Sequence, residues 1–243
     1  MKEITVGVDN VSVIYRSLSL RGITNHTAVD GFSHIFEPGN IYGFIGRNGA
    51  GKTTLLSAIA GYRKIFAGSV TINGENVFEN SAYAPHINFI YQKNFAEDYT
   101  KVKKYLKKAA IFRPNFDMDY AHNLLERFEV PLDKRMRRLS KGHQSAVIIT
   151  IGLASRCSLT IFDEAYVGMD APNRQIFYDE LIKEQEQHPR TVIMSSHLIS
   201  EVEYLFDKVV IIHKGKLVQN ANYDATKEMN LQDLFINLTE GEK

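Results

Sequence analysis

The pattern of apolar and polar positions predicts strands that alternate with helices along most of the chain. Short apolar runs bounded by turn residues are typical of buried strands, and apolar positions three or four apart indicate helices. The predicted strands are residues 4–8, 11–15, 27–36, 41–45, 68–73, 87–91, 159–162, 191–195 and 209–213. Because strands alternating with helices form largely parallel sheets covered on both faces, the predicted fold class is α/β.

Residues 93–156 depart from this alternation, since the pattern there predicts helices without strands. Their polar positions fall on one side of each helix, as on the outer face of a packed helix. We therefore expect one domain over 1–243, with an α/β core formed by residues 1–92 and 157–219 and a helical subdomain inserted at 93–156. The polar residues 220–243 are expected to be a loosely attached C-terminal tail.

Composition narrows the class of protein. A chain of 243 residues with a 44% apolar share can bury a core, and the net charge of +1 gives no sign of nucleic-acid binding. The single cysteine, Cys157, excludes an internal disulfide and is expected to be a buried, inert thiol. The sequence shows no signal peptide, and its longest apolar stretch, 146–154, is too short to cross a bilayer, so we expect a cytoplasmic protein.

The stretch at residues 46–54 fits the phosphate-binding pattern G-x-x-x-x-G-K-[ST]. It follows the apolar strand predicted at 41–45 and opens a helix predicted at 54–60, which disfavours a chance Gly-rich turn. Glycines allow backbone N–H groups to surround a phosphate, and the start of the helix adds about half a positive charge. Lys52 can reach the β- and γ-phosphates, and the Thr53 hydroxyl can ligate Mg²⁺.

Polar residues also follow three other predicted strands: Gln92, the pair Asp163 and Glu164, and His197. The carboxyl ends of parallel strands face the ligand crevice. A carboxylate there can hold Mg²⁺ and a second one can polarise a hydrolytic water. Each residue alone is more often a turn or capping residue, but together beside a phosphate loop they favour a catalytic site.

Ser140 opens the long helix that begins near Gly142. Its hydroxyl is suited to cap that helix, and the same helix end could present N–H groups to an anion. From helix physics alone, capping is favoured.

In this order, the motifs resemble those of an ATP-binding-cassette (ABC) ATPase over nearly the whole chain. The resemblance implies a P-loop NTPase (RecA-like) core with an N-terminal antiparallel β part and an inserted α-helical subdomain. It assigns Tyr15 to adenine stacking and implies that nucleotide is bound by Tyr15, Asn48, Gly49, Ala50, Gly51, Lys52, Thr53, Thr54, Ser140, Gly142 and Asp170. It implies catalytic roles for Glu164, His197 and Gln92 and metal ligation by Thr53, Gln92 and Asp163.

The resemblance also implies partners and cofactors. Two ABC ATPase chains, alike or unlike, are expected to meet head to tail around two ATP molecules with Mg²⁺, so that Ser140 of one chain faces the nucleotide of the other. An integral-membrane permease is expected to dock near Gln92 and the inserted helices, which would place the chain on the inner face of the cell membrane. No nucleic-acid partner is expected.

Several positions depart from the family pattern. Lys141 and His143 stand in the signature motif where Gly and Gln are usual, and Ala165 and Tyr166 follow the catalytic Glu where Pro and Thr are usual. We expect these changes to affect the interface between chains more than the in-line chemistry. They leave open a weak ATPase or a pair of unlike cassettes with one good site.

The C-terminal segment 231–239 resembles that of ABC-2-type exporter ATPases, and Met169–Pro172 and His188–Thr191 resemble a Gram-positive subgroup exporting phenol-soluble modulins or responding to cell-envelope stress. The predicted function is an ATPase that powers export of peptides or other amphipathic or antimicrobial compounds. The alternative is a low-turnover regulatory or non-transport ABC ATPase. DNA-repair and translation cassettes are disfavoured, because the insertion is short and there is one phosphate loop.

Overall fold

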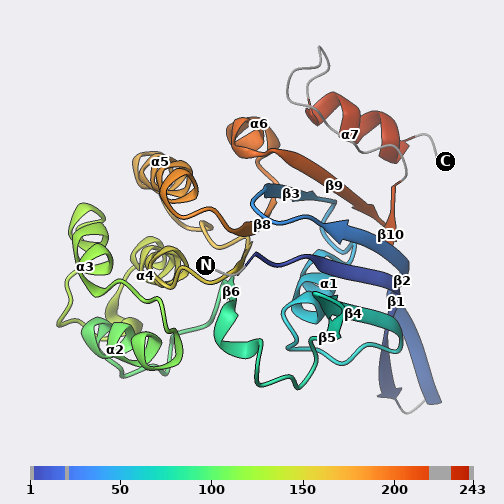
Figure 1. Cartoon of the computed structure of the whole chain (residues 1–243), viewed down its shortest axis with the longest axis horizontal. Helices are drawn as coiled ribbons and strands as arrows, with labels where there is room; N and C mark the ends of the chain where they lie inside the picture. Colours follow the sequence, from blue (N-terminus) through green and yellow to red (C-terminus); the bar gives the residue numbers. More distant parts are fainter. Residues whose placement is uncertain (1–2, 20–21, 219–230, 241–243) are drawn as a thin grey trace.

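The computed structural model describes residues 3–19, 22–218 and 231–240, which form two β-sheets and the helices that pack on them (Figure 1). The strands described are β1 (Val6–Ser19), β2 (Gly22–Phe36), β3 (Ile41–Ile45), β4 (Ala67–Ile72), β5 (Glu75–Asn76), β6 (Ile87–Tyr91), β7 (Leu159–Asp163), β8 (Thr191–Ser196), β9 (Lys208–His213) and β10 (Lys216–Leu217). The α-helices described are α1 (Lys52–Ile59), α2 (Val102–Phe112), α3 (Met118–Arg127), α4 (Lys141–Ala154), α5 (Ala171–Gln187), α6 (Ile199–Val202) and α7 (Leu231–Glu240).

The N-terminal sheet is antiparallel, in the strand order β2-β1-β4-β5. Where the sequence predicts two strands, 4–8 and 11–15, the structure has the single long strand β1. The pairing register with β2 shifts between Val8 and Val11, where Asn10 has a φ of 46°. The polar interruption is therefore an irregularity within β1 and not its end.

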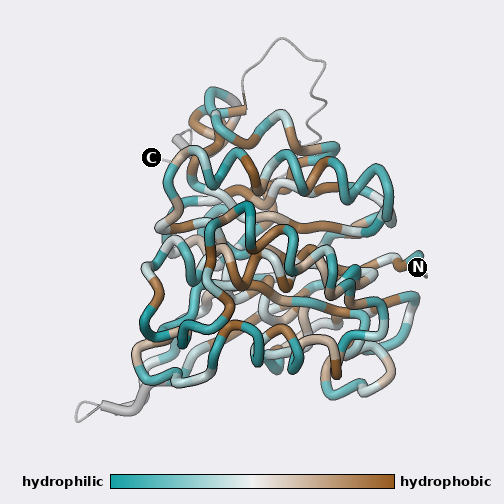
Figure 2. The backbone as a smooth tube through the Cα atoms, turned by 90° about the vertical axis from the view of Figure 1, so that its left-hand side faces the viewer, coloured by the Kyte–Doolittle hydropathy of each residue, from teal (hydrophilic) through white to brown (hydrophobic). Residues whose placement is uncertain are grey.

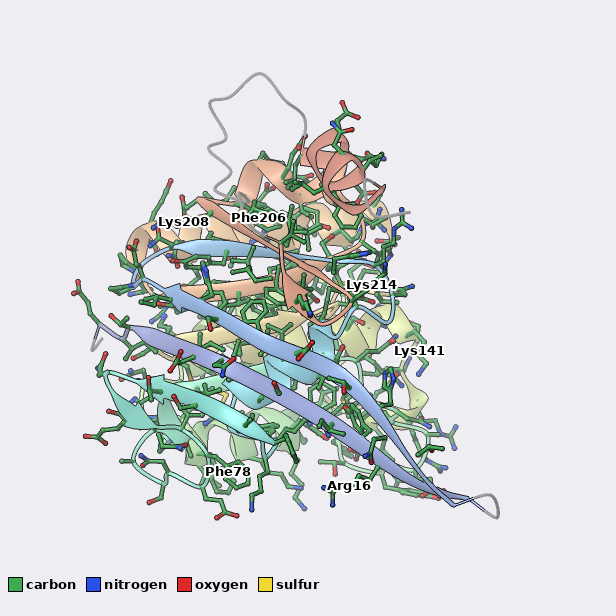
Figure 3. The ribbon with its side chains drawn as sticks, turned by 90° about the vertical axis from the view of Figure 1, so that its right-hand side faces the viewer. Arg16, Phe78, Lys141, Phe206, Lys208 and Lys214 are labelled. Atoms are coloured by element: carbon green, nitrogen blue, oxygen red, sulfur yellow. The ribbon has the colours of Figure 1, made fainter. Side chains whose placement is uncertain are left out.

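The second sheet has the order β10-β9-β3-β8-β7-β6, and its strands from β9 to β6 run parallel to their neighbours. Their carboxyl ends consequently meet at one edge. Figure 3 labels Lys208 at the start of β9 and Lys214 just beyond its end, and Lys141 at the start of α4 lies toward the Lys214 side. This edge is where parallel α/β sheets bind ligands.

Both faces of the parallel sheet are buried, because alternate residues of each strand enter different cores. Tyr42 and Phe44 pack with α1 and the antiparallel sheet, whereas Ile41 and Ile45 face the core that α2 to α7 cover. Figure 2 shows the matching colours, with brown stretches along the inner strands and mixed brown and teal turns on the helices. The predicted α/β class, with its antiparallel part and its inserted helices, is confirmed.

Helix α7 corrects one expectation about the tail. Its first residue, Leu231, is fully buried and its backbone N–H donates to Glu203 at 3.2 Å. Phe235 and Leu238 also pack on the core, since they follow Leu231 at helical spacing. Residues 231–240 are therefore attached, and the rest of the predicted tail lies outside the described residues. Among the residues that the structure describes, no helix has the length and apolar character to cross a bilayer.

Candidate functional site

The phosphate loop joins the end of β3 to the start of α1, as the sequence predicts. Gly51 precedes the helix with a φ of 102°, and a Cβ there would lie 2.3 Å from the carbonyl oxygen of Ala28. Only glycine fits this position. The loop is also tied to the turn after β9, because Gly215 N–H donates to the Ala50 carbonyl at 3.0 Å.

Lys52 is buried within this loop, and its Nζ points toward Glu164. Its Nζ donates to the Gly46 carbonyl at 2.8 Å and lies 3.6 Å from Glu164 Oε1. A buried lysine with carbonyl and carboxylate partners is held in one direction. It is therefore placed to meet an anionic group that enters between the loop and β7.

A cavity of about 450 Å³ opens beside the loop. Its size falls within the roughly 300–1,000 Å³ that is usual for small-molecule sites. It is lined by Tyr15, His26, Ala28, Asn48, Gly49, Gly51, Lys52, Thr53, Thr54, Tyr91, Gln92, Asp163 and Glu164. The loop, the adenine-stacking candidate and the expected metal ligands thus share one cavity. Its side-chain oxygen ligands, its buried lysine and its glycine loop fit a magnesium–triphosphate.

Asp163 and Glu164 at the end of β7 are oriented by Ser195 on the neighbouring strand. The Ser195 hydroxyl donates to Asp163 Oδ1 at 2.6 Å and accepts from the Glu164 backbone N–H at 3.0 Å. The two strands are parallel, with Asp163 opposite Ser195. Sequence reasoning missed Ser195, because its partner is known only once the register of β7 and β8 is known.

His197 lies next to Glu164 at the end of β8. Its Nδ1 is 3.7 Å from Glu164 Oε2, and its side chain is 46% exposed. Gln92 reaches the same region from β6, since Tyr91 is opposite Asp163 in the parallel register. The strand ends of β6, β7 and β8 therefore bring Gln92, Asp163, Glu164 and His197 to one side of the loop.

The hairpin of β1 and β2 forms the end of the cavity where Tyr15, the adenine-stacking candidate, lies. Tyr15 is paired with His26 across the two strands, and both line the cavity. The Tyr15 hydroxyl is 3.0 Å from Thr54 Oγ1, and the guanidinium carbon of Arg63 lies 4.8 Å from the centre of its ring. Sequence reasoning missed His26, because the hairpin register was needed to find it.

Ser140, Gly142 and Asp170 lie apart from the residues that line this cavity. Ser140 and Asp170 are exposed and act as helix N-caps, accepting from the backbone N–H groups of His143 at 3.2 Å and Asn173 at 3.0 Å. The capping expected for Ser140 is confirmed. Gly142 approaches the Gly168 carbonyl so closely that a Cβ would lie 2.8 Å from it. The starts of α4 and α5 thus lie close together outside the cavity, on either side of the loop that follows β7.

Two departures from the family pattern lie in the interior. Ala165 and Tyr166 are buried, and Tyr166 packs against His197. The Tyr166 ring thus lies beside His197 within one chain, and the expectation that these changes affect chiefly the interface between chains stays a prediction. Cys157 is buried as expected, and burial raises its pKa to about 11.

Residues 29–167 match the protein family described as ABC transporter. This chain belongs to that family. It is 31% identical to the ABC transporter ATP-binding protein YtrB of Bacillus subtilis over 219 residues, covering 88% of this chain and 73% of the relative. It is 30% identical to the bacitracin transport ATP-binding protein BcrA of Bacillus licheniformis over 220 residues, covering 89% and 72%.

Solved structures show the same fold. The structure described as the ATP binding subunit of an ABC transporter has a TM-score of 0.80 at 21% identity, covering 96% of this chain and 98% of that one. A dimeric ATP-binding cassette bound to ADP and Pi has a TM-score of 0.74 at 18% identity, covering 87% and 96%. The chain is thus an ATP-binding cassette of the ABC family.

Proposed function

We propose that this chain binds magnesium–ATP in the cavity beside its phosphate loop and hydrolyses it to power a membrane exporter. The observation that carries this proposal is the cavity itself, which Lys52, Asp163 and Glu164 line together with the glycines of the phosphate loop. Lys52 and the loop hold the phosphates, Glu164 orients the attacking water, and His197 steadies the γ-phosphate. The chemistry that Mg²⁺ supplies when bound by Thr53, Gln92 and Asp163 is charge neutralisation on the phosphate oxygens.

A pair of variants separates binding from hydrolysis. Glu164→Gln keeps the size of the side chain and is expected to retain ATP binding while turnover falls roughly 100-fold or more, as for a lost general base. Lys52→Ala is expected to lose most nucleotide affinity, and Lys64→Ala, an exposed lysine beyond α1, to keep it. Calorimetric titration and a phosphate-release assay measure the two properties.

The same experiment tests the alternative function. If wild-type protein binds ATP but releases phosphate no faster than Glu164→Gln, a low-turnover regulatory or non-transport ABC ATPase is favoured. Lys141 and His143 in the signature motif make that outcome physically reasonable, because they alter the surface offered to the second nucleotide. Unchanged affinity in Lys52→Ala would contradict the phosphate-loop assignment itself.

The proposed cargo is a peptide or another amphipathic or antimicrobial compound, handled by an integral-membrane permease that this chain drives from the cytoplasmic face. The relative named for bacitracin transport supports this substrate class. The ABC-2-type and Gram-positive subgroups that the sequence resembles support it as well. A second cassette, of the same or another chain, is proposed to complete each nucleotide site.

A groove of about 220 Å³ beside α2 is the proposed docking site for the permease. Its wall includes Tyr62 and Phe112, whose side chains are 59% and 69% exposed. Lys93, Lys108 and Arg113 also line it. Exposed aromatic side chains among cations fit a permease segment that carries an apolar side chain flanked by carboxylates.

Charge reversal tests this docking. Lys108→Glu is expected to reduce co-purification of the chain with its permease, since the cationic wall then repels carboxylates. ATPase activity of the isolated chain should stay unchanged, because Lys108 lies in the groove wall and not among the residues lining the nucleotide cavity. Glu126→Lys, an exposed change on α3, is the control and should keep the complex. Equal recovery of both variants with the permease would contradict the docking site.

A further inference from the structure

Tyr166 is an unusual neighbour for the histidine at the end of β8. It is 1% exposed, and its ring stacks beside the His197 imidazole with centroids 6.2 Å apart at an interplanar angle of 29°. Its hydroxyl lies 2.7 Å from Ser196 Oγ. One side chain thus contacts both His197 and the residue before it.

The position of Tyr166 is itself fixed by the core. The ring of Tyr178 on α5 packs edge-on against it, with centroids 6.3 Å apart at 71°. Burial raises the pKa of Tyr166, so the hydroxyl keeps its proton and can donate or accept a hydrogen bond. A buried and packed aromatic ring is a rigid support for an exposed neighbour.

The His197 side chain is exposed, so a rigid neighbour can decide its orientation. Its side chain is 46% exposed, and the contact of its Nδ1 with Glu164 Oε2 is long, at 3.7 Å. Helix α6 begins at Ile199 without a side-chain N-cap. Instead the Leu198 N–H donates to Ser196 Oγ at 2.9 Å. The Ser196 hydroxyl therefore links the residue before His197 to the residue after it. Tyr166 anchors that hydroxyl.

We propose that Tyr166 is a positioning residue for His197, holding the imidazole toward Glu164 through its stacked ring and its bond to Ser196. The proposal rests on the catalytic role proposed above for His197. It predicts that changes at Tyr166 lower kcat without lowering ATP affinity, since the nucleotide cavity is lined by other residues.

The central test is a set of double-mutant cycles. The rate of hydrolysis is measured in single-turnover assays, because these can follow slow variants. Tyr166→Phe keeps the ring, loses the hydroxyl and is expected to lower kcat roughly 3- to 10-fold, as for one hydrogen bond. Ser196→Ala should lower it at least as much, and adding Tyr166→Phe to Ser196→Ala should change nothing further. In a His197→Ala background, Tyr166→Phe should likewise have no additional effect.

A matched control removes a structural tyrosine hydroxyl elsewhere. Tyr120→Phe breaks a 3.0 Å bond to Glu180 on the far side of α5, so it should lower stability without changing kcat. Hydrogen exchange of the nucleotide-free protein gives a second readout. Residues 196–202 should exchange faster in Tyr166→Phe than in Tyr120→Phe, because the Leu198 N–H is bonded to Ser196 Oγ.

The outcomes separate the two proposals. If His197→Ala hydrolyses ATP at the wild-type rate, the catalytic role of His197 is wrong and Tyr166 positions nothing. If His197→Ala is slow but Tyr166→Phe and Ser196→Ala are both as fast as wild type, only the positioning role of Tyr166 is wrong. An equal loss from Tyr166→Phe with and without His197 would also overturn it.

Discussion

Ser195 is a small side chain that bonds both the proposed metal ligand Asp163 and the proposed catalytic residue Glu164. Ser195 is fully buried, and its hydroxyl donates to the Asp163 carboxylate and accepts from the Glu164 N–H. Glu164 itself has a φ of 48°. A non-glycine residue in that region costs on the order of 1–3 kcal/mol and persists only where its surroundings hold it. The hydroxyl therefore helps to keep Glu164 in a strained conformation that aims it at the cavity.

We predict that Ser195→Ala lowers the free energy of unfolding by about 1–3 kcal/mol, because a buried carboxylate and an N–H lose their partner. Turnover should fall with it, since Asp163 and Glu164 lose their fixed orientation. Urea denaturation and a phosphate-release assay measure the two effects. Ser155→Ala removes a hydroxyl bond to the Ile151 carbonyl at the end of α4. It should lower stability but leave turnover unchanged. Full turnover in Ser195→Ala would show that the hydroxyl has no orienting role.

The residues of the site differ in how far the sequence could reveal them. Lys52, Asp163 and Glu164 follow apolar strands, so their place at the sheet edge follows from parallel topology alone. Ser195 and His26 act through neighbours on adjacent strands, and a shift of one residue in register would remove those contacts. Register depends on packing between strands, which the local pattern does not contain.

At the scale of elements, a buried ion cluster joins α5 to the end of α4 and to β8. Glu184 on α5 accepts from Arg156 at 3.0 Å and from Arg190 at 3.5 Å, and Arg156 also pairs with Asp117 at 3.0 Å. Glu184 and Arg190 are almost fully buried, and burial lowers the pKa of Arg190. The cluster fixes the helices before β7 and β8 relative to each other.

We predict that Glu184→Ala costs about 3–5 kcal/mol of folding free energy, because two arginines lose their buried partner. Chemical denaturation measures the change. Glu186→Ala, two residues along the same helix and exposed, should stay within about 0.5 kcal/mol of wild type. A similar small effect at both positions would mean that water or rearranged side chains replace the Glu184 carboxylate.

The elements themselves were largely predictable, and the errors have physical causes. Strands such as β3, β7 and β8 are buried on both faces and read as apolar runs. The sequence pattern predicts two strands in place of β1, because the irregularity at Asn10 places polar residues inside the strand. The sequence pattern does not predict the attachment of α7, because it depends on packing of Leu231, Phe235 and Leu238 against distant residues of the core.

At the scale of the whole molecule, Ser140 and Asp170 are expected nucleotide contacts that do not line the nucleotide cavity of their own chain. Ser140 and Asp170 are exposed at the starts of α4 and α5, beside the edge that carries the phosphate loop. A free helix start attracts phosphate through its N–H groups and its dipole. A second chain turned head to tail would bring this helix start to the γ-phosphate, as the family resemblance implies.

A pair of substitutions at Ser140 tests this assembly without disturbing the cap. Asn and Asp both replace Ser well as N-caps, so the bond from the His143 N–H is kept in each. In a Glu164→Gln background, Ser140→Asn should form an ATP-dependent dimer on size-exclusion chromatography with light scattering. Ser140→Asp should remain monomeric, because its carboxylate would face the γ-phosphate of the partner chain. Each variant should bind ATP equally well as a monomer, since Ser140 is not among the residues that line the cavity. Dimers of equal stability in both variants would mean that this helix start does not meet the nucleotide.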